Sequence, residues 1–363
     1  MGSVTQTIRW WGILLCASVS GLVYLGTATS VMAVSYSARA QVSGEVDTNI
    51  REDHEQAATD EAFRFFSSLR ASGGFFKDIK YRIIGNGGLR GYRTLAEENR
   101  LVGQTRLSVS RAWENGFQME ALGAFFVENY RQGWRDNITY LSRLEMTLPT
   151  SYSALHRIVL AYQYLNNSYM HNQFFNQGEN RLDARGFQPI TRRFTIMVAT
   201  GLGIRDFNRA PEPYADERTG DLIQPFKSYQ EDFFVEPEIS LQYYRHILLE
   251  FNYMFREYRS NSKGFSFREH RIGMVIGSRF IYGSTIKILA NISAKQYREK
   301  EPSIIIDLDE DREADNRGVI EISRNLNDQT ALEFQYELYH NESRLRRRYY
   351  SKSVISLGLQ YRL

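Results

Sequence analysis

The sequence predicts an all-β protein: a closed, up-and-down antiparallel barrel of about 16 transmembrane strands, within a range of about 14 to 18. Three observations support this fold class. Short runs of alternating apolar and polar residues follow one another along most of the chain. Tyrosine and phenylalanine are abundant, at 23 and 22 residues, whereas there are only 7 prolines. After residue 40 there is no uninterrupted apolar stretch of about 20 residues, which excludes a bundle of transmembrane helices.

The N-terminus has the pattern of a secretory signal peptide. Arg9 precedes an apolar run at residues 10–34, and Ala38-Arg39-Ala40 supplies small residues around a cleavage site. A retained transmembrane anchor is the competing interpretation, because the run is long enough to cross a bilayer. We expect cleavage, which divides the chain into a signal peptide (residues 1–40) and a barrel domain (residues 41–363).

Alternation along the chain also places the individual strands. Tight connections, such as residues 245–246, alternate with longer ones, such as 207–229, and outer-membrane barrels show this asymmetry between periplasmic turns and external loops. An even number of strands returns both chain ends to one side, so the weakest segment, 41–51, is counted as a strand. From the C-terminus, the predicted strands lie near 348–363, 329–342, 315–325, 284–298, 265–280, 246–258, 230–244, 193–207, 179–188, 154–166, 136–147, 117–129, 101–112, 79–90, 61–72 and 41–51.

The last predicted strand carries a sorting pattern. Ser356, Gly358, Tyr361 and Leu363 place polar, small, aromatic and terminal apolar residues at a spacing that resembles the C-terminal signal read by the bacterial barrel-assembly machinery. The sequence departs from that signal at Leu363, where Phe or Trp is usual. The resemblance implies insertion by that machinery into the outer membrane, with outer-membrane lipid and lipopolysaccharide as surroundings.

Charged residues alternate with apolar ones in most predicted strands, and we expect them to face the interior. In the strand near 246–258, for example, Ile247, Leu249 and Phe251 would face lipid. The charges form either a ladder of ion pairs that stiffens the wall or the lining of a permeation path, and both interpretations stay open. The lumen-lining candidates are Arg82, Arg106, Arg143, Arg157, Arg205, Glu250, Arg256, Arg271, Arg279, Lys287 and Glu333, with Glu120, Glu145, Glu236, Glu238 and Glu321 as further acids.

Two predicted external loops bear on whether the pore is open. About 16 strands enclose an interior too wide for wall side chains alone to fill. The third loop, near 129–136, is short, which disfavours a long constricting third loop and favours a dedicated export channel or a gated channel. The longest loop, near 208–228, is a candidate plug or lid, because prolines and aromatic residues stiffen it; the residues concerned are Pro211, Pro213, Tyr214, Pro225 and Phe226.

Several other functions find little support in the sequence. The formal net charge is +3, with acids and bases interspersed, so we expect no nucleic-acid partner. The six histidines are scattered, and we find no glycine-flanked serine nucleophile or cofactor fingerprint, so we expect neither an enzyme nor a cofactor. The acidic run 307–315 lacks the ordered ligand positions of an EF-hand. The basic run 344–348 fits either an anion-binding loop or a plain charged loop.

Segments near both ends of the barrel domain resemble a known family. Val46-Asp47-Thr48-Asn49-Ile50, together with residues 336–343 and 350–363, is similar to the beta-barrel porin type 2 family. The resemblance implies a channel that exports exopolysaccharide or capsule-type polymer and that has periplasmic polysaccharide-export proteins as partners. Two alternatives stay open: a passive or gated diffusion porin for small solutes, and a plugged structural or adhesion barrel.

Overall fold

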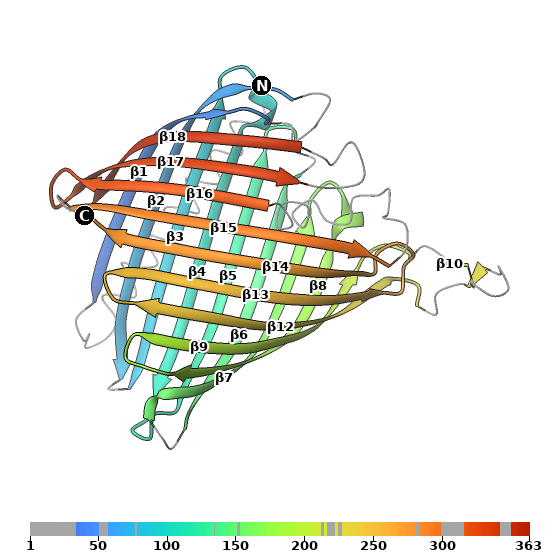
Figure 1. The fold of residues 1–363 in the computed structure, drawn as a ribbon. Helices are drawn as coiled ribbons and strands as arrows, with labels where there is room; N and C mark the ends of the chain where they lie inside the picture. The colour runs from blue at the N-terminus through green and yellow to red at the C-terminus, as the bar shows by residue number, and fades with distance from the viewer. Residues whose placement is uncertain are drawn as a thin grey trace.

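A single closed barrel dominates the structure (Figure 1). The computed structural model describes residues 34–50, 57–76, 78–133, 135–150, 153–211, 214–215, 222–223, 227–280, 283–298, 316–341 and 350–363. Within these residues sixteen strands form one antiparallel sheet, in which β1 closes the ring against β18. In Figure 1 the gold to red strands β12–β18 cross the front, and the blue and cyan strands form the wall behind them. The predicted fold class is confirmed.

The barrel strands are 10 to 17 residues long, enough for tilted strands to cross a bilayer. They are β1 (Ser35–Asp47), β2 (Asp60–Phe76), β3 (Ile79–Tyr92), β4 (Arg100–Ala112), β5 (Gln118–Tyr130), β6 (Asn137–Thr150), β7 (Ser153–Tyr169), β8 (Gln177–Pro189), β9 (Phe194–Phe207), β12 (Gln230–Tyr244), β13 (Ile247–Ser260), β14 (Phe267–Arg279), β15 (Ser284–Tyr297), β16 (Asn316–Asn325), β17 (Thr330–Asn341) and β18 (Tyr350–Arg362).

The remaining elements are short. Strands β10 (Tyr214–Ala215) and β11 (Leu222–Ile223) pair with each other in a separate two-stranded sheet. Two 3-10 turns, η1 (Ala96–Glu98) and η2 (Gln173–Phe175), lie in loops. In the described part of the chain, no helix is long and apolar enough to span a bilayer.

Strand β1 differs most from its predicted range. It covers Ser35–Asp47, whereas the sequence predicted a strand at 41–51. Alternation continues toward the N-terminus through Tyr36 and Ala38, and Ser35 pairs with Ser72 of β2. The small and polar residues of this stretch resemble a cleavage region, which hid the start of the strand. Every later barrel strand overlaps its predicted range.

The outward face of the barrel is apolar, as predicted. In β13, Ile247, Leu249 and Phe251 are exposed, and in β18 so are Leu357 and Leu359. Such a broad apolar surface would promote aggregation in water, but it matches the hydrocarbon of a bilayer. The fold and this surface together place the protein among outer-membrane barrels.

The two ends of the barrel differ. At one end, which we call the turn end, β1 begins, β18 stops, and short connections such as residues 245–246 and 326–329 join the strands. The amide of Leu363 donates to the carbonyl of Ala38 there, at 2.9 Å. The opposite end, which we call the loop end, carries the longer connections, including the one between β9 and β12. The β5–β6 connection at the loop end is short, as predicted.

A row of aromatic rings packs on the inner face near the loop end. Phe234, Tyr258 and Phe267 are buried on β12, β13 and β14, and the Tyr258 and Phe267 centroids lie 4.7 Å apart with nearly parallel rings. Phe234 lies over β9 at Gly203, where a Cβ would be 2.6 Å from its Cε1 and 2.7 Å from its Cε2. Only glycine leaves room for the ring at this position.

Candidate functional site in the barrel interior

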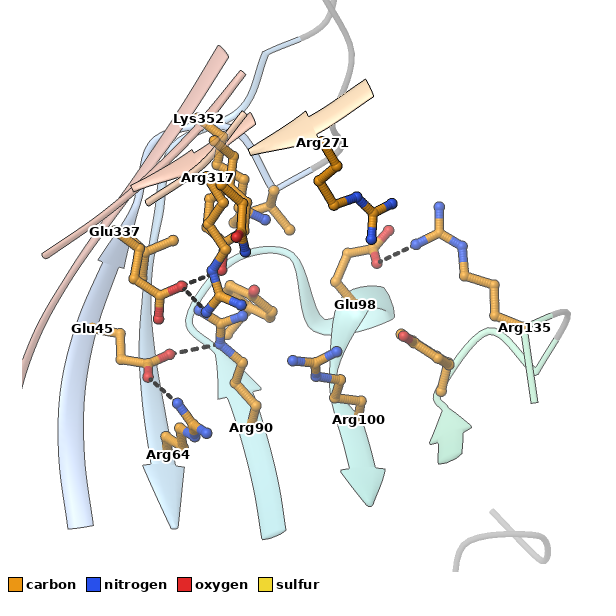
Figure 2. Close-up of a pocket in the computed structure, with 16 residues that line it drawn as sticks. Glu45, Arg64, Arg90, Glu98, Arg100, Arg135, Arg271, Arg317, Glu337 and Lys352 are labelled. Atoms are coloured by element: carbon orange, nitrogen blue, oxygen red, sulfur yellow. Dashed lines mark hydrogen bonds and ion pairs between the residues drawn. The ribbon is translucent and has the colours of Figure 1, made fainter. Parts of the chain in front are cut away.

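A cavity of about 610 Å³ lies against the inner face of the barrel wall. Its lining comes from ten consecutive strands around the ring, β14–β18 and β1–β5, so the side chains that reach it point inward (Figure 2). Ile50, Glu98 and Arg135 from loop segments also line it, which places it toward the loop end. We call it the arginine cavity, because its cations are Arg64, Arg90, Arg100, Arg135, Arg271, Arg317 and Lys352.

The pairing of residues between neighbouring strands shows which side chains face the barrel interior. Because neighbouring residues on a strand alternate between faces, partners across the sheet share a face. All eleven predicted lumen candidates fall on the inner face by this rule. Five form ion pairs there (Arg143, Arg205, Arg256, Arg271 and Glu333), while Arg82, Arg106, Arg157, Glu250, Arg279 and Lys287 lie on it by register. Their contribution to permeation stays a prediction.

A chain of ion pairs follows the inner face away from the arginine cavity. Arg181 of β8 reaches Glu236 of β12 at 2.7 Å, crossing β9 where Gly201 and Gly203 carry no side chain. Arg143 of β6 likewise crosses β7 to reach Asp183 of β8 at 3.3 Å. In order, the chain runs Arg271, Glu269, Arg256, Glu236, Arg181, Asp183, Arg143, Glu145 and Arg185.

Two acids of β1 anchor the cations beside the barrel closure. Glu45 binds Arg64 at 3.3 Å and Arg90 at 2.7 Å, as Figure 2 shows. Asp47, which is fully buried, binds Lys352 of β18 at 3.2 Å. The sequence prediction missed these acids as site residues, because acids weakened the case for a strand in this segment. Their spacing of two, Glu45 and Asp47, is the signal that they share one inward face.

In most of these pairs the cation is more exposed than its acid. The side chain of Arg64 is 49% exposed against 2% for Glu45, and that of Arg317 is 45% exposed against 11% for Glu337. Carboxylates sit on short side chains near the wall, whereas the longer arginine side chains extend into the lumen. Glu145, as exposed as its partner Arg185, is an exception. The interior surface is therefore more positive than its near-balanced composition suggests.

A second cavity of about 540 Å³ adjoins the first at Arg100, which lines both. Apolar side chains dominate one part of its lining, although barrel interiors are usually polar. Polar groups border them: Asn86 donates to Gln104 Oε1 at 2.9 Å, and Asn137 and Thr139 lie nearby in the lining. We call the apolar part the wall patch; it consists of the half-buried residues Phe66, Val102, Phe126, Leu141 and Leu165.

The β5–β6 loop supports the rim of the arginine cavity. Arg135 lies 3.8 Å from Glu98 of η1. The amide of Tyr130 donates to Asp136 Oδ1 at 2.6 Å, which fixes the start of the loop. Burial raises the pKa of the Asp136 carboxyl above its usual value, although this hydrogen bond acts in the opposite direction.

The predicted plug lies only partly within the described residues. Pro211 follows β9 and Tyr214 begins β10, which stands clear of the barrel wall in Figure 1. Pro213, Pro225 and Phe226 lie outside the described residues, as do the runs 307–315 and 344–348. No group of three or more metal-ligating side chains occurs in the part that the structure describes.

The residues of the predicted assembly signal all lie on or beside the strand that closes the barrel. Ser356 and Gly358 face inward, while Tyr361 and Leu363 face outward and are exposed. A Cβ at Gly358 would lie 2.8 Å from both the Val42 carbonyl oxygen and Ser43 Cβ of β1, so this close approach requires glycine. Recognition by the assembly machinery stays a prediction.

Comparison with solved structures identifies the fold. OmpF of Salmonella typhi, solved in complex with daunomycin, superposes with a TM-score of 0.55 at 9% sequence identity, over 91% of this chain and 97% of that chain. The chain has the fold of an outer-membrane porin. No protein-family description matches the sequence, and no curated protein matches it. The resemblance to the beta-barrel porin type 2 family is therefore not confirmed.

Two other barrels are less similar to this porin fold. CdiB from Acinetobacter baumannii has a TM-score of 0.48 at 8% identity over 89% of this chain, which spans 60% of the length of CdiB. A bacterial polysaccharide outer-membrane secretin has a TM-score of 0.46 at 9% identity, over 90% of this chain and 98% of that chain. Similarities this low carry no argument about cargo.

Proposed function

We propose that the protein is an outer-membrane channel that exports exopolysaccharide or capsule-type polymer. The observation that carries the proposal is the barrel interior. The outer face of the barrel is apolar, whereas its interior holds two adjoining cavities, one lined by cations and one lined partly by apolar side chains. A plugged structural barrel would have no need for such a lining. The sequence resemblance to export-associated porins supports the same cargo class.

The lining suits a flexible polymer of sugars. Phenylalanine rings such as Phe66 and Phe126 offer apolar faces to the C–H faces of sugar rings, and nearby amides such as Gln104 offer hydrogen bonds to hydroxyl groups. Contacts of this kind are individually weak. A chain that makes several of them at once can exchange one for the next and so advance through the barrel.

A diffusion porin is the second candidate. The width of the closed ring favours it, because sixteen strands enclose an interior that wall side chains alone do not fill, and small solutes can pass through such an interior. Such a porin would need no periplasmic partners, whereas an exporter would need proteins that deliver the polymer to the turn end. Both candidates are consistent with the expectation from the sequence that the protein is not an enzyme.

Single-channel recording of the refolded protein in a planar bilayer tests the proposal, with and without deletion of residues 208–228. A barrel that is closed and opens on deletion supports a gated exporter. Large conductance in both forms supports a diffusion porin. Silence in both forms contradicts every channel function and supports the structural alternative.

A further inference from the structure

We propose that the arginine cavity and the wall patch together bind an acidic saccharide, a sugar unit that carries a carboxylate. The inference rests on the proposed polysaccharide channel for its setting and adds the charge class of the cargo. It identifies one place where that cargo makes its strongest contacts. The carboxylate would lie among the cations of the cavity, and the sugar ring would lie on the wall patch beyond Arg100.

The first step of the argument is the sign of the cavity surface. Seven cations line the cavity against three carboxylates, those of Glu45, Glu98 and Glu337. Three acids behind the lining, Asp47, Glu128 and Glu269, offset part of this excess, but they lie deeper than their partners. Glu269 is fully buried, for example, while the side chain of its partner Arg271 is 25% exposed. A ligand in the cavity therefore meets guanidinium groups before it meets carboxylates.

The second step is that the cations are held in place before any ligand arrives. Arg90 binds Glu45 and lies over the ring of Tyr92, 5.1 Å from its centroid. Arg317 binds Glu337 at 2.7 Å and lies over Tyr339 at the same distance, 5.1 Å. Side chains already ordered in this way lose little further freedom on binding. Each guanidinium has five N–H donors, so a salt bridge to one acid leaves donors for a second.

The third step is the junction between the two cavities. Arg100 lines both cavities and binds Glu128 at 3.1 Å. A carboxylate bound beside Arg100 therefore places the rest of its molecule on the wall patch. The cavity of about 540 Å³ is large enough for a sugar unit.

The border of the wall patch favours a sugar over an alkyl chain. The side chains of Asn86, Gln104, Asn137 and Thr139 line the same cavity as the phenylalanines. An alkyl carboxylate would cover these polar groups without hydrogen-bonding them, which costs free energy. A sugar ring presents apolar C–H faces to the phenylalanines and hydroxyl groups to the amides at once.

Calorimetry on the refolded mature protein in detergent micelles tests the inference without requiring conduction. The probes are a short oligogalacturonate, a neutral malto-oligosaccharide of equal length, octanoate and inorganic phosphate. The variants are Arg64→Gln and Arg317→Gln in the arginine cavity and Phe126→Ala in the wall patch. The side chains of Arg64 and Arg317 are exposed, so we expect their replacement to leave the fold intact. Arg93→Gln is the matched control, because Arg93 lies in the loop after β3, lines neither cavity and has a side chain that is 73% exposed and paired with Glu61 of β2.

We expect oligogalacturonate to bind at least 10-fold more tightly than the neutral oligosaccharide and octanoate, with affinity that falls as salt rises. Arg64→Gln and Arg317→Gln should each weaken it about 10-fold. Phe126→Ala should weaken oligogalacturonate binding while leaving the weak binding of inorganic phosphate unchanged, and Arg93→Gln should change neither.

Equal affinity for the neutral oligosaccharide, tighter binding of octanoate, no binding at millimolar concentration, or indifference to both arginine substitutions would each overturn the inference. The result is separable from the channel proposal. A silent barrel that binds oligogalacturonate contradicts only the channel, whereas a conducting barrel that does not bind it contradicts only the acidic-saccharide site.

Discussion

Replacing Gly203 with alanine tests the packing of the aromatic row on the inner face. A Cβ at this position would lie 2.6 Å from Cε1 and 2.7 Å from Cε2 of Phe234, closer than real Cβ contacts occur. The ring cannot simply move aside. The Phe234 ring stacks on Tyr258 at a centroid distance of 6.2 Å. The guanidinium carbon of Arg181 lies 5.7 Å from the centroid of the Phe234 ring.

The expected cost follows from these contacts. Overpacking a tight site costs about 1–3 kcal/mol, and disturbing an aromatic pair costs about 0.5–1.5 kcal/mol more. Alanine recovers about 0.5–1 kcal/mol because it restricts the unfolded chain more than glycine does. We therefore expect Gly203→Ala to lower the free energy of unfolding by about 2 kcal/mol.

Urea unfolding of the barrel in lipid vesicles, followed by tryptophan fluorescence, measures this change. Gly123→Ala on β5 is the matched control, since no heavy atom lies within 4 Å of a Cβ built there. We expect the control to be neutral or slightly stabilising. If the two variants unfold within about 0.5 kcal/mol of each other, the close packing of Phe234 on β9 is refuted.

Three further predictions follow from other parts of the structure. Glu236→Gln should lower the free energy of unfolding by about 3 kcal/mol, because the buried carboxylate joins Arg181 and Arg256, and an unchanged urea midpoint would contradict this. The mature protein should begin before Ser35, since cleavage after Ala40 would remove the first six residues of β1; intact-mass measurement on membrane-extracted protein decides this. The raised pKa of Asp136 disfavours its ionised form in the folded protein, so its contribution to stability falls as pH rises from its unfolded pKa through its folded pKa. Asn cannot ionise, so Asp136→Asn should gain stability relative to the wild type over that window in urea titrations at several pH values.

The strands and their faces could be predicted because each depends only on local alternation. The period of two assigned Ile247 and Leu249 outward, and register then fixes the rest of the ring. The wall patch was harder to predict, because Phe125 and Phe126 are adjacent aromatics on opposite faces and hide the alternation. Propensity alone cannot separate two such neighbours.

The sequence indicated a ladder of ion pairs as one interpretation, but the partners within the ion-pair chain could not be predicted, for a different reason. Its bonds cross intervening strands, so they depend on distances around the ring that no local pattern encodes. Arg181 reaches Glu236 only because Gly201 and Gly203 leave the surface of β9 open. Small residues at inward positions, flanked by long charged residues on the strands to either side, are the sequence signal for such crossings.

The pairing of β1 with β18 bears on how the barrel assembles. The bonds at this junction join residues about 300 positions apart, as between Thr48 and Ser353, so they are the most non-local contacts in the wall. Contacts of such high sequence separation form slowly. Until β18 emerges from the translocation machinery, β1 presents an unpaired edge that can pair with another chain. A chain truncated before Tyr350 should therefore aggregate or be degraded rather than insert as a smaller barrel.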